Sequence, residues 1–531
     1  MTAKNIVLCS DGTGNSDTKG RGTNVFKLYE AVDIHGHKFD HSLTRQIAFY
    51  DDGVGTENFA LLRIIGEAFG HGFAKNVRDL YTELVHVYAP EDKLFLFGFS
   101  RGAYTIRALA GMIQYCGVLR RDGFEREADL EAGIKICWKA FEKAAFPRFI
   151  TDKKRRAGKA SADADSLQRR EKLGSHPDQA NIEFLGVWDT VGAVGMPVDE
   201  LKPLVNWICP RKFGELTPGS QVRRACHALS IDDERRTFHP ELWNETGARP
   251  GQVEQVWFAG VHSNVGGGYP KQGLSLVALD WMMGEVEENG LRFTSTAREY
   301  IRAQQDVHDR LYDSRAGYAV YYRWDPRNIA KICQDHGVVK PKIHASVFER
   351  IANTTDGYAP GNIPANLEIT DTRDMPPRPQ LIGEVRDTIR AELEKLQAES
   401  LQSLPDMRRW TWVGYLSYYG FLLLTIAAIY WASPPVRGLS LVEQTTTIGQ
   451  WLWGLVTSIT ALVDVAKNLA TTWWFLLGLF ICYLVSSLVD NRMERRYSGF
   501  WHKIRALIDP WRVRAQEGRG DAVTPSTRNA P

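Results

Sequence analysis

The chain reads KLFLFGFSRGAYTIRALAGMIQYCG over residues 93–117, which joins a buried-strand pattern directly to a helical one. At the junction, residues 98–102 form a Gly-x-Ser-x-Gly pentapeptide centred on Ser100. The pentapeptide alone is a weak signal. Between a strand and a helix it is typical of a nucleophile elbow, a strained turn that lifts a serine above the sheet. The junction therefore predicts that Ser100 is a nucleophile, with a structural turn serine as the alternative.

Strand and helix patterns alternate on both sides of this junction. Short apolar runs predict further strands at residues 4–10, 45–50, 181–188 and 253–261. Strands separated by helices favour an α/β fold with a mostly parallel sheet and helices on both faces. We expect one such domain over residues 1–380, with a charged helical insertion at about 120–180.

Two strand ends downstream of Ser100 could complete a catalytic triad. A serine hydroxyl needs a base that is itself oriented by an acid, and in this kind of sheet the chain order is serine, acid, histidine. Asp189 follows the strand at 181–188, and His262 follows the strand at 253–261. The three side chains would then meet at the carboxyl edge of one parallel sheet.

Each partner of Ser100 has alternatives. Asp189 could instead close an Asx turn, and His262 could cap the glycine-rich loop that follows it. His239 is a second candidate base, but it follows no predicted strand. Asp232 and Asp233 are further candidate acids, but they lie in the charged run IDDERR, which is typical of a salt-bridged surface or a cleft rim. We therefore expect Asp189 and His262 to act with Ser100.

The tetrahedral intermediate of acyl transfer also needs amide donors. The backbone N–H of Arg101, at the start of the predicted helix, is the first candidate. The second is expected from the DGTGN turn after the first strand, through Gly12 or Thr13. This turn could also cradle a phosphate, but it lacks the glycine spacing and the Lys-Ser/Thr pair of nucleotide-binding loops. An oxyanion hole is therefore the favoured interpretation.

Three carboxylates follow the first two strands at the same predicted edge. Asp11 could orient the DGTGN turn or contact a substrate head group, and Asp51 and Asp52 could line the cleft. A metal held by Asp11 and Asp52 has no supporting ligand cluster. The seven cysteines show no CxxC pair and no Cys/His metal spacing. We therefore predict no metal and no other cofactor.

The charge balance bears on the class of partner. The formal net charge is +2, whereas nucleic-acid-binding proteins are usually distinctly basic. A basic run within the 120–180 insertion is expected to be a solvated surface. We therefore predict no nucleic-acid partner. The oligomeric state is not set by the sequence.

Two uncharged segments late in the chain predict a transmembrane hairpin. Residues 410–432 and 471–489 are each long enough to cross about 30 Å of hydrocarbon, with a pair of buried core helices as the alternative. Trp and Tyr flank the spans, and arginines lie before the first span and after the second, which predicts that both ends are cytoplasmic. We expect a bacterial inner-membrane protein with a cytoplasmic catalytic domain.

The C-terminal part divides into three predicted pieces. A charged linker helix covers residues 381–407, the hairpin covers 408–496, and a basic amphipathic segment with a disordered tail covers 497–531. The last piece mixes aromatic and basic residues, which is typical of a segment that lies on an anionic membrane surface. The lipid bilayer is therefore a predicted partner.

Six ordered motifs of this chain resemble the DUF2235 family, which includes the catalytic domain of Tle1-type phospholipase effectors of type VI secretion. The motifs are CSDGTGN, YDDGVGT, GFSRGAY, FLGVWDTVGAVG, ALSIDDERRTFHPELW and QVWFAGVHSNVGGGY, and the resemblance covers roughly residues 3–360. It implies an α/β-hydrolase-like fold and a Ser-Asp-His triad at Ser100, Asp189 and His262. It also implies cleavage of glycerophospholipid acyl esters, as in the effector members.

Together these observations predict a membrane-anchored serine hydrolase that cleaves carboxylic esters, with lipid acyl esters as the expected substrates. The hairpin is an addition to the effector pattern, and an anchored enzyme would meet the bilayer continuously. Two alternatives stay open at this point. One is a non-catalytic sensor or scaffold that uses a hydrolase fold for binding, and the other is a hydrolase of a soluble ester.

Overall fold

A computed structural model describes most of the N-terminal part of the chain and short pieces of the C-terminal part. The described ranges are 3–12, 22–52, 68–145, 166–177, 180–192, 218–364 apart from 317, 318 and 320, and 366–371, together with helical stretches that include 412–425 and 477–489. The chain divides into two compact units. One contains residues 1–394 and 504–531, and the other contains residues 395–503.

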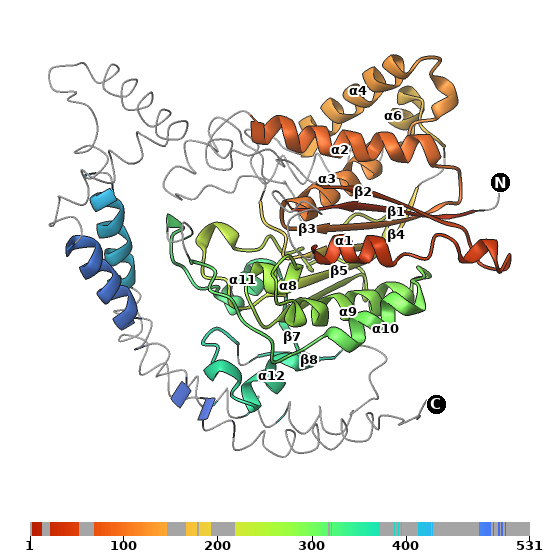
Figure 1. Cartoon of the computed structure of the whole chain (residues 1–531). Coiled ribbons are helices and arrows are strands. Elements are labelled where there is room, and N and C mark those ends of the chain that lie inside the picture. Colours follow the sequence, from red (N-terminus) through yellow and green to blue (C-terminus); the bar gives the residue numbers. More distant parts are fainter. Residues whose placement is uncertain are drawn as a thin grey trace, which may run out of the picture. The chain divides into compact units, whose positions relative to one another are not determined.

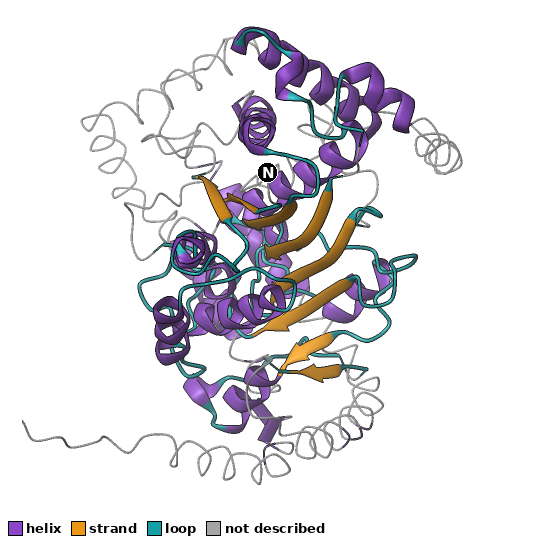
Figure 2. Cartoon of the chain, turned by 90° about the vertical axis from the view of Figure 1, so that its right-hand side faces the viewer, coloured by secondary structure: helices purple, strands orange, loops and turns teal. Residues whose placement is uncertain are grey.

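The first unit is built on one parallel sheet (Figures 1 and 2). Its strands lie in the order β2-β1-β3-β4-β5-β6-β7-β8, and each described pairing is parallel. The strands are β1 (Asn5–Ser10), β2 (Gln46–Asp51), β3 (Lys93–Phe99), β4 (Asn181–Trp188), β5 (Val222–Ser230), β6 (Val253–Phe258), β7 (Lys342–His344) and β8 (Glu368–Thr370). The predicted mostly parallel α/β sheet is confirmed.

Three of these strands are not predicted by the sequence. β5 contains RRACH, whose charged residues interrupt the apolar run, yet the strand is central in the sheet and its last six residues are buried. β7 and β8 are three residues long and lie in the Pro- and Gly-rich segment between the last predicted strand and the linker helix. Short strands such as these carry too few residues to show a period of two.

Helices cover both faces of the sheet, as Figure 2 shows. The principal helices are α1 (Asn24–Ala31), α2 (Ala68–Val87), α3 (Ser100–Cys116), α4 (Glu127–Ala145), α6 (Ser166–Leu173), α8 (His262–Gly266), α9 (Gly273–Glu287), α10 (Ser295–Gln304), α11 (Ile329–Asp335) and α12 (Ala345–Ala352). β1 is buried along its whole length, and its side chains alternate between the two faces. Ile6 and Leu8 enter one core, and Val7 and Cys9 enter the other.

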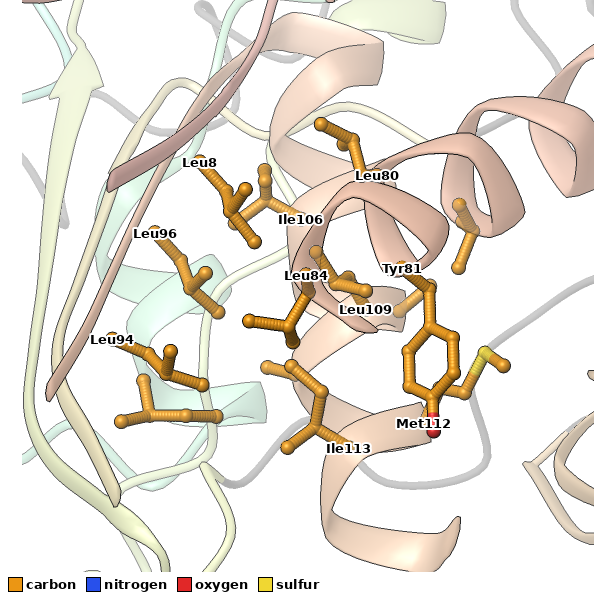
Figure 3. Packing of buried hydrophobic residues seen from close by; sticks show 14 of the residues in the cluster. Leu8, Leu80, Tyr81, Leu84, Leu94, Leu96, Ile106, Leu109, Met112 and Ile113 are labelled. Carbon is orange, nitrogen blue, oxygen red and sulfur yellow. The ribbon is translucent and has the colours of Figure 1, made fainter. Parts of the chain in front are cut away.

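The first core lies between the sheet and helices α2, α3 and α4. Figure 3 shows leucines of β1 and β3 opposite apolar side chains of α3 and α2. The second core lies between the other face of the sheet and helices α1, α9 and α10. Burial of both faces explains the nearly continuous apolar runs of the strands. Packing on both faces also fixes the positions of the strand ends and of the side chains that follow them.

The predicted insertion at 120–180 is described in two pieces. α4 and α6 lie there and contribute to the first core or contact α3, while residues 146–165 lie outside the described residues. Arg170 of α6 is buried and donates to the backbone oxygen of Gln114 at 2.8 Å. The described part of the insertion is therefore packed on the domain rather than standing away from it.

The second unit contains the predicted hairpin, of which the helical stretches 412–425 and 477–489 are described. The hydroxyl of Ser417 donates to the backbone oxygen of Cys482 at 3.0 Å, and Gly478 leaves room for Leu424. These contacts run in opposite directions along the two stretches, so the stretches are antiparallel. Within the described residues, no helix has the length and apolar character that a membrane span requires. The predicted spans 410–432 and 471–489 lie partly outside the described residues.

Candidate active site

Ser100 lies at the sharp turn between β3 and α3. Its backbone φ is +58°, in the left-handed region that side chains other than glycine rarely adopt. The two glycines of the pentapeptide allow this turn. A Cβ on Gly102 would lie 2.2 Å from the backbone oxygen of Ser10, and one on Gly98 would lie 2.6 Å from the backbone oxygen of Gly102. Gly102 is therefore required by close packing of α3 on the end of β1, and Gly98 by close packing of β3 on the first turn of α3.

Asp189 and His262 come from two other strand ends of the same edge. Asp189 directly follows β4, and His262 is the first residue of α8, shortly after β6. Asp189 also has a positive φ, +38°, and is completely buried. Backbone strain of this kind is held only where the surrounding structure fixes it, and it is concentrated at functional sites.

The structure brings the three predicted triad residues into one hydrogen-bonded chain. Nε2 of His262 lies 2.8 Å from Oγ of Ser100. Nδ1 of His262 lies 2.6 Å from Oδ2 of Asp189. These are normal hydrogen-bond lengths for a nucleophile, its base and the acid that orients the base. The arrangement can move a proton from the serine hydroxyl to the imidazole.

The imidazole of His262 is enclosed by aromatic rings and a second carboxylate. The ring of Phe99 lies 4.6 Å away between centroids, and the ring of Phe238 lies 5.0 Å away, edge to face. The backbone N–H of His262 donates to Oδ2 of Asp233 at 3.2 Å. Asp233 in turn pairs with Arg235, whose guanidinium lies 3.5 Å from the centroid of Phe238. The ring is thus fixed in orientation and shielded from water.

Arg327 is a buried partner of Asp189 that the sequence does not point to. Its Nη1 donates to Oδ1 of Asp189 at 2.7 Å and its Nη2 donates to Oδ2 at 2.8 Å. The backbone N–H of Ser230 also donates to Oδ1, at 3.0 Å. Arg327 lies in the loop before α11, and arginines in loops are mostly exposed. No local pattern marks it, because the contact spans 138 residues of sequence.

The surroundings set the protonation states of the triad. Burial alone would raise the pKa of Asp189, but the charge and hydrogen bonds of Arg327, together with those of His262, hold it well below the ordinary range. Burial lowers the pKa of His262, although the hydrogen bond and charge of Asp189 partly oppose this. The acid is therefore ionised and the imidazole is neutral at neutral pH, which is the state that a general base requires.

The three residues predicted to donate to the oxyanion lie in different surroundings. Arg101 lies in the first turn of α3, directly after Ser100. The backbone N–H of Gly12 donates instead to Oδ1 of Asp11, at 2.6 Å. Thr13 lies outside the described residues. The amide of Gly12 is therefore bonded within its own turn, whereas Arg101 directly follows Ser100 at the start of α3.

Asp11 anchors the turn after β1. Its carboxylate accepts from Thr23 and from the hydroxyl of Tyr50, the latter at 2.7 Å. Burial raises its pKa to about 6, although the hydrogen bonds from these two side chains and Gly12 lower it. The Asp11 carboxylate is thus bonded to groups of the protein itself, at Gly12, Thr23 and Tyr50.

Asp51 and Asp52 follow one another at the end of β2, near Asp11. Oδ2 of Asp51 accepts from Ser10 at 3.0 Å and from Asn76 at 2.9 Å. Asp52 is exposed. Among the residues that the structure describes, no group of three or more His, Cys, Asp or Glu side chains is placed to hold a metal ion.

The alternative base and acids are engaged elsewhere. Nε2 of His239 lies 2.7 Å from the backbone oxygen of Asp325. Asp232 accepts from the backbone N–H of Gly260 at 2.6 Å and from the hydroxyl of Tyr358 at 2.9 Å. Asp233 accepts from the backbone N–H of His262, whereas the ring nitrogen Nδ1 faces Asp189. These residues hold the loops of the site in place, so the geometry supports Asp189 and His262 over them.

The family of this chain is shown by a match to a family model. The family model for the catalytic domain of Tle1-like phospholipase effectors of the type VI secretion system matches residues 4–285, which is more than half of the 531-residue chain. The chain belongs to the Tle1-like catalytic domain family. The matched range of the Tle1-like domain includes the three hydrogen-bonded residues and ends before Arg327.

Individual proteins similar to this Tle1-like chain have low sequence identity to it. An uncharacterized protein of Saccharomyces cerevisiae, YEL023C, is 26% identical over 250 residues, which is 45% of this chain and 32% of the yeast protein. The chain thus matches about a third of the length of that relative. The crystal structure of an uncharacterized protein from Pseudomonas aeruginosa is 18% identical with a TM-score of 0.33, covering 74% of this chain and 60% of that one. The Tle1 effector bound to the VgrG spike of the type VI secretion system is 15% identical with a TM-score of 0.25, covering 50% and 52%.

Proposed function

We propose that this chain is a serine hydrolase that cleaves carboxylic esters of lipids, with glycerophospholipid acyl esters as the substrate class. The observation that carries the proposal is the hydrogen-bonded chain from Ser100 through His262 to Asp189 at one edge of the sheet. The membership in a family of phospholipase effector domains supports the lipid substrate.

In the first step, Oγ of Ser100 attacks the ester carbonyl while Nε2 of His262 takes the hydroxyl proton. The imidazolium that forms lies against the ionised Asp189, which stabilises it and keeps Nδ1 protonated. The same imidazolium then gives its proton to the departing alcohol, leaving an acyl group on Ser100. A water molecule, activated by His262 in the same way, releases the fatty acid.

The oxygen of the tetrahedral intermediate needs donors that are fixed before the reaction begins. The backbone N–H of Arg101 lies directly after the nucleophile at the start of α3, where the helix dipole also favours negative charge. In nucleophile-elbow enzymes the residue after the serine supplies one donor of this kind. We assign this role to Arg101.

A membrane surface is the proposed location of the substrate. The described helical stretches of the second unit expose large apolar side chains, including Trp412, Leu416, Leu423, Phe480 and Tyr483. Apolar area of this extent is unusual on a protein surface that faces water. We propose that these stretches belong to a membrane anchor over residues 408–496, and that the catalytic unit is cytoplasmic as the flanking arginines predict.

A binding protein with a hydrolase fold is the main alternative. The strained φ of Ser100 favours catalysis, because strain of this kind has no use in a purely structural turn. A hydrolase of soluble esters is the second alternative, and it shares the triad chemistry. The lipid hydrolase and the soluble-ester hydrolase are therefore separated by how the substrate is presented rather than by the site.

The test is ester turnover in mixed detergent micelles by the full chain. Glycerophospholipid hydrolysis is measured beside hydrolysis of a short soluble ester. For Ser100→Ala and His262→Ala, we expect a loss of about a thousandfold or more in kcat. His239→Gln removes the alternative base but keeps an amide that can donate to the backbone oxygen of Asp325, so it serves as a control that keeps most of the activity. Turnover of the soluble ester alone would favour the second alternative, and no turnover of either by the wild type would favour the binding protein.

A further inference from the structure

Arg327 makes a close charged contact with the triad acid. Its guanidinium faces the Asp189 carboxylate with both terminal nitrogens, at 2.7 and 2.8 Å, and both side chains are completely buried. A bidentate arginine–carboxylate pair fixes the plane of the carboxylate and stabilises its ionised form. Nη2 of Arg327 donates to Oδ2 of Asp189, the same oxygen that lies 2.6 Å from Nδ1 of His262.

The guanidinium of Arg327 also donates hydrogen bonds to two backbone oxygens. Nη1 of Arg327 donates to the backbone oxygen of Ser230, at the end of β5, and Nη2 donates to the backbone oxygen of Phe238. The segment that delivers Arg327 is tied to the loop after β5, because the N–H of Asp325 donates to the backbone oxygen of Glu234 at 2.7 Å. Arg327 therefore links Asp189 to two backbone segments that are anchored at the edge of the sheet.

We propose that Arg327 is a positioning residue of the reaction, which holds the Asp189 carboxylate in the charge state and orientation that His262 needs. This inference rests on the proposed function. The residue is assigned no contact with the substrate and acts through Asp189. It lies beyond the matched range of the family model, which ends at residue 285, so the triad is oriented by a segment outside that range.

The charges around His262 explain what the pairing achieves. Two carboxylates face this residue, Asp189 at Nδ1 and Asp233 at the backbone, and each is paired with its own arginine, Arg327 and Arg235. The ring is therefore not surrounded by uncompensated negative charge. The neighbouring side chains of His227 and His239 are kept neutral by burial, which lowers the pKa of each.

Loss of Arg327 would change this balance in a definite direction. Without the guanidinium, the negative charge of Asp189 is uncompensated and stabilises the protonated imidazole more strongly. The pKa of His262 would rise, so the neutral form that accepts the serine proton would be lost at a higher pH. A residue that only supports folding would lower the amount of active protein without moving the pH dependence.

The experiment measures the labelling rate of Ser100 by a fluorophosphonate as a function of pH. In this reaction the serine oxygen displaces fluoride from phosphorus and His262 takes the hydroxyl proton, so the lipid substrate need not be known. Full-length wild type is compared with Arg327→Gln and Arg327→Lys. For Arg327→Gln we expect a labelling rate about 10- to 100-fold lower, as for other groups that orient a functional side chain through a hydrogen bond. We also expect the pH midpoint of labelling to shift upward. Arg327→Lys, which keeps the charge, should restore part of both.

Two controls separate positioning from folding. Arg298→Lys alters another buried arginine–aspartate pair, with Asp280, which lies away from the site. It should leave the pH midpoint and the rate per folded molecule unchanged. In an Asp189→Asn background, Arg327→Gln should change the labelling rate by less than about twofold, because its effect passes through Asp189. This double variant also removes both buried charges together, which protects folding.

The possible outcomes distinguish failure of the proposed function from failure of the positioning role. If the wild type is not labelled, the proposed function fails. If the wild type is labelled and Ser100→Ala is not, but Arg327→Gln keeps the wild-type rate and pH midpoint, only the positioning role is overturned. The positioning role is also overturned if Arg327→Gln lowers the rate by the same factor with Asp189 and with Asp189→Asn.

Discussion

Nε2 of His262 lies 2.8 Å from Oγ of Ser100, although 162 residues separate the two in the sequence. The contact exists because β3 and β6 end at the same edge of one parallel sheet, with β4 and β5 between them. Both faces of that sheet are covered by helices, so the strand ends are rigid supports. The geometry of the site therefore depends on packing far from Ser100 and His262.

The strained turn at Ser100 makes a prediction about stability. Glycine accepts a positive φ without steric cost, whereas alanine does not. We expect Ser100→Gly to be more stable than Ser100→Ala by about 1 kcal/mol, with both variants inactive. Thermal unfolding followed by circular dichroism measures this difference. At Ala110, in the ordinary helical part of α3, the order should reverse, and Ala110→Gly should cost about 1 kcal/mol. Equal stability of the two Ser100 variants would contradict the strained turn.

Close packing at Gly102 makes a second prediction. A methyl group at this position would lie 2.2 Å from the backbone oxygen of Ser10 and 2.5 Å from that of Asp11, so β1 or α3 must shift. We expect Gly102→Ala to lower both the melting temperature and the esterase rate, because the shift displaces Ser100 and the turn after β1. Gly123→Ala is the matched control, since nothing lies within 4 Å of a Cβ there. An active, stable Gly102→Ala variant would refute the proposed turn geometry.

The local sequence predicts the elements of the site better than the contacts that hold them in place. Ser100, Asp189 and His262 each follow a recognisable apolar run, so the parallel sheet and its edge can be inferred from local pattern. Arg327 reaches Asp189 through a loop whose course is set by tertiary packing, and nothing in the neighbouring residues marks it. The role of Gly12 is likewise not set by local sequence, because its amide could face either an oxyanion or the side chain of its neighbour.

The state of His262 predicts the pH dependence of the wild type. The imidazole acts as a base only when neutral, so kcat/KM should fall as the pH drops through the pKa of His262 in the free enzyme. Burial lowers that pKa, so the acid limb should lie below the ordinary histidine value of about 6.5. Initial rates on a soluble ester across the acid range give the midpoint. A midpoint above neutrality would show that Asp189 and Asp233 outweigh burial.

The buried carboxyl of Asp11 predicts a different pH effect, on stability. Its folded pKa, about 6, lies above that of an exposed aspartate, so the folded state holds this proton more tightly than the unfolded state. The contribution of Asp11 to stability is therefore greatest in acid and decreases as the pH rises through about 4 to 6. Chemical denaturation of wild type and Asp11→Asn at several pH values isolates this contribution. A stability difference that does not vary over this range would contradict the raised pKa.

The proposed membrane anchor predicts a fractionation result. The full chain should stay with membranes after alkaline carbonate washing, because integral segments resist this treatment while peripheral proteins are released. A variant that lacks residues 408–496 should move to the supernatant and still cleave a soluble ester. Release of the full chain by carbonate would contradict the anchor but leave the catalytic proposal intact.

The central claim is that Ser100 is an activated nucleophile, and active-site labelling tests it most directly. The full chain is treated with a fluorophosphonate, and the modified peptide is identified by mass spectrometry, beside Ser100→Ala and His262→Ala. We predict a single label on the GFSRG peptide at Ser100, no label on Ser100→Ala, and greatly slowed labelling of His262→Ala. An unlabelled wild type, or a label that persists at another residue in Ser100→Ala, would contradict the claim.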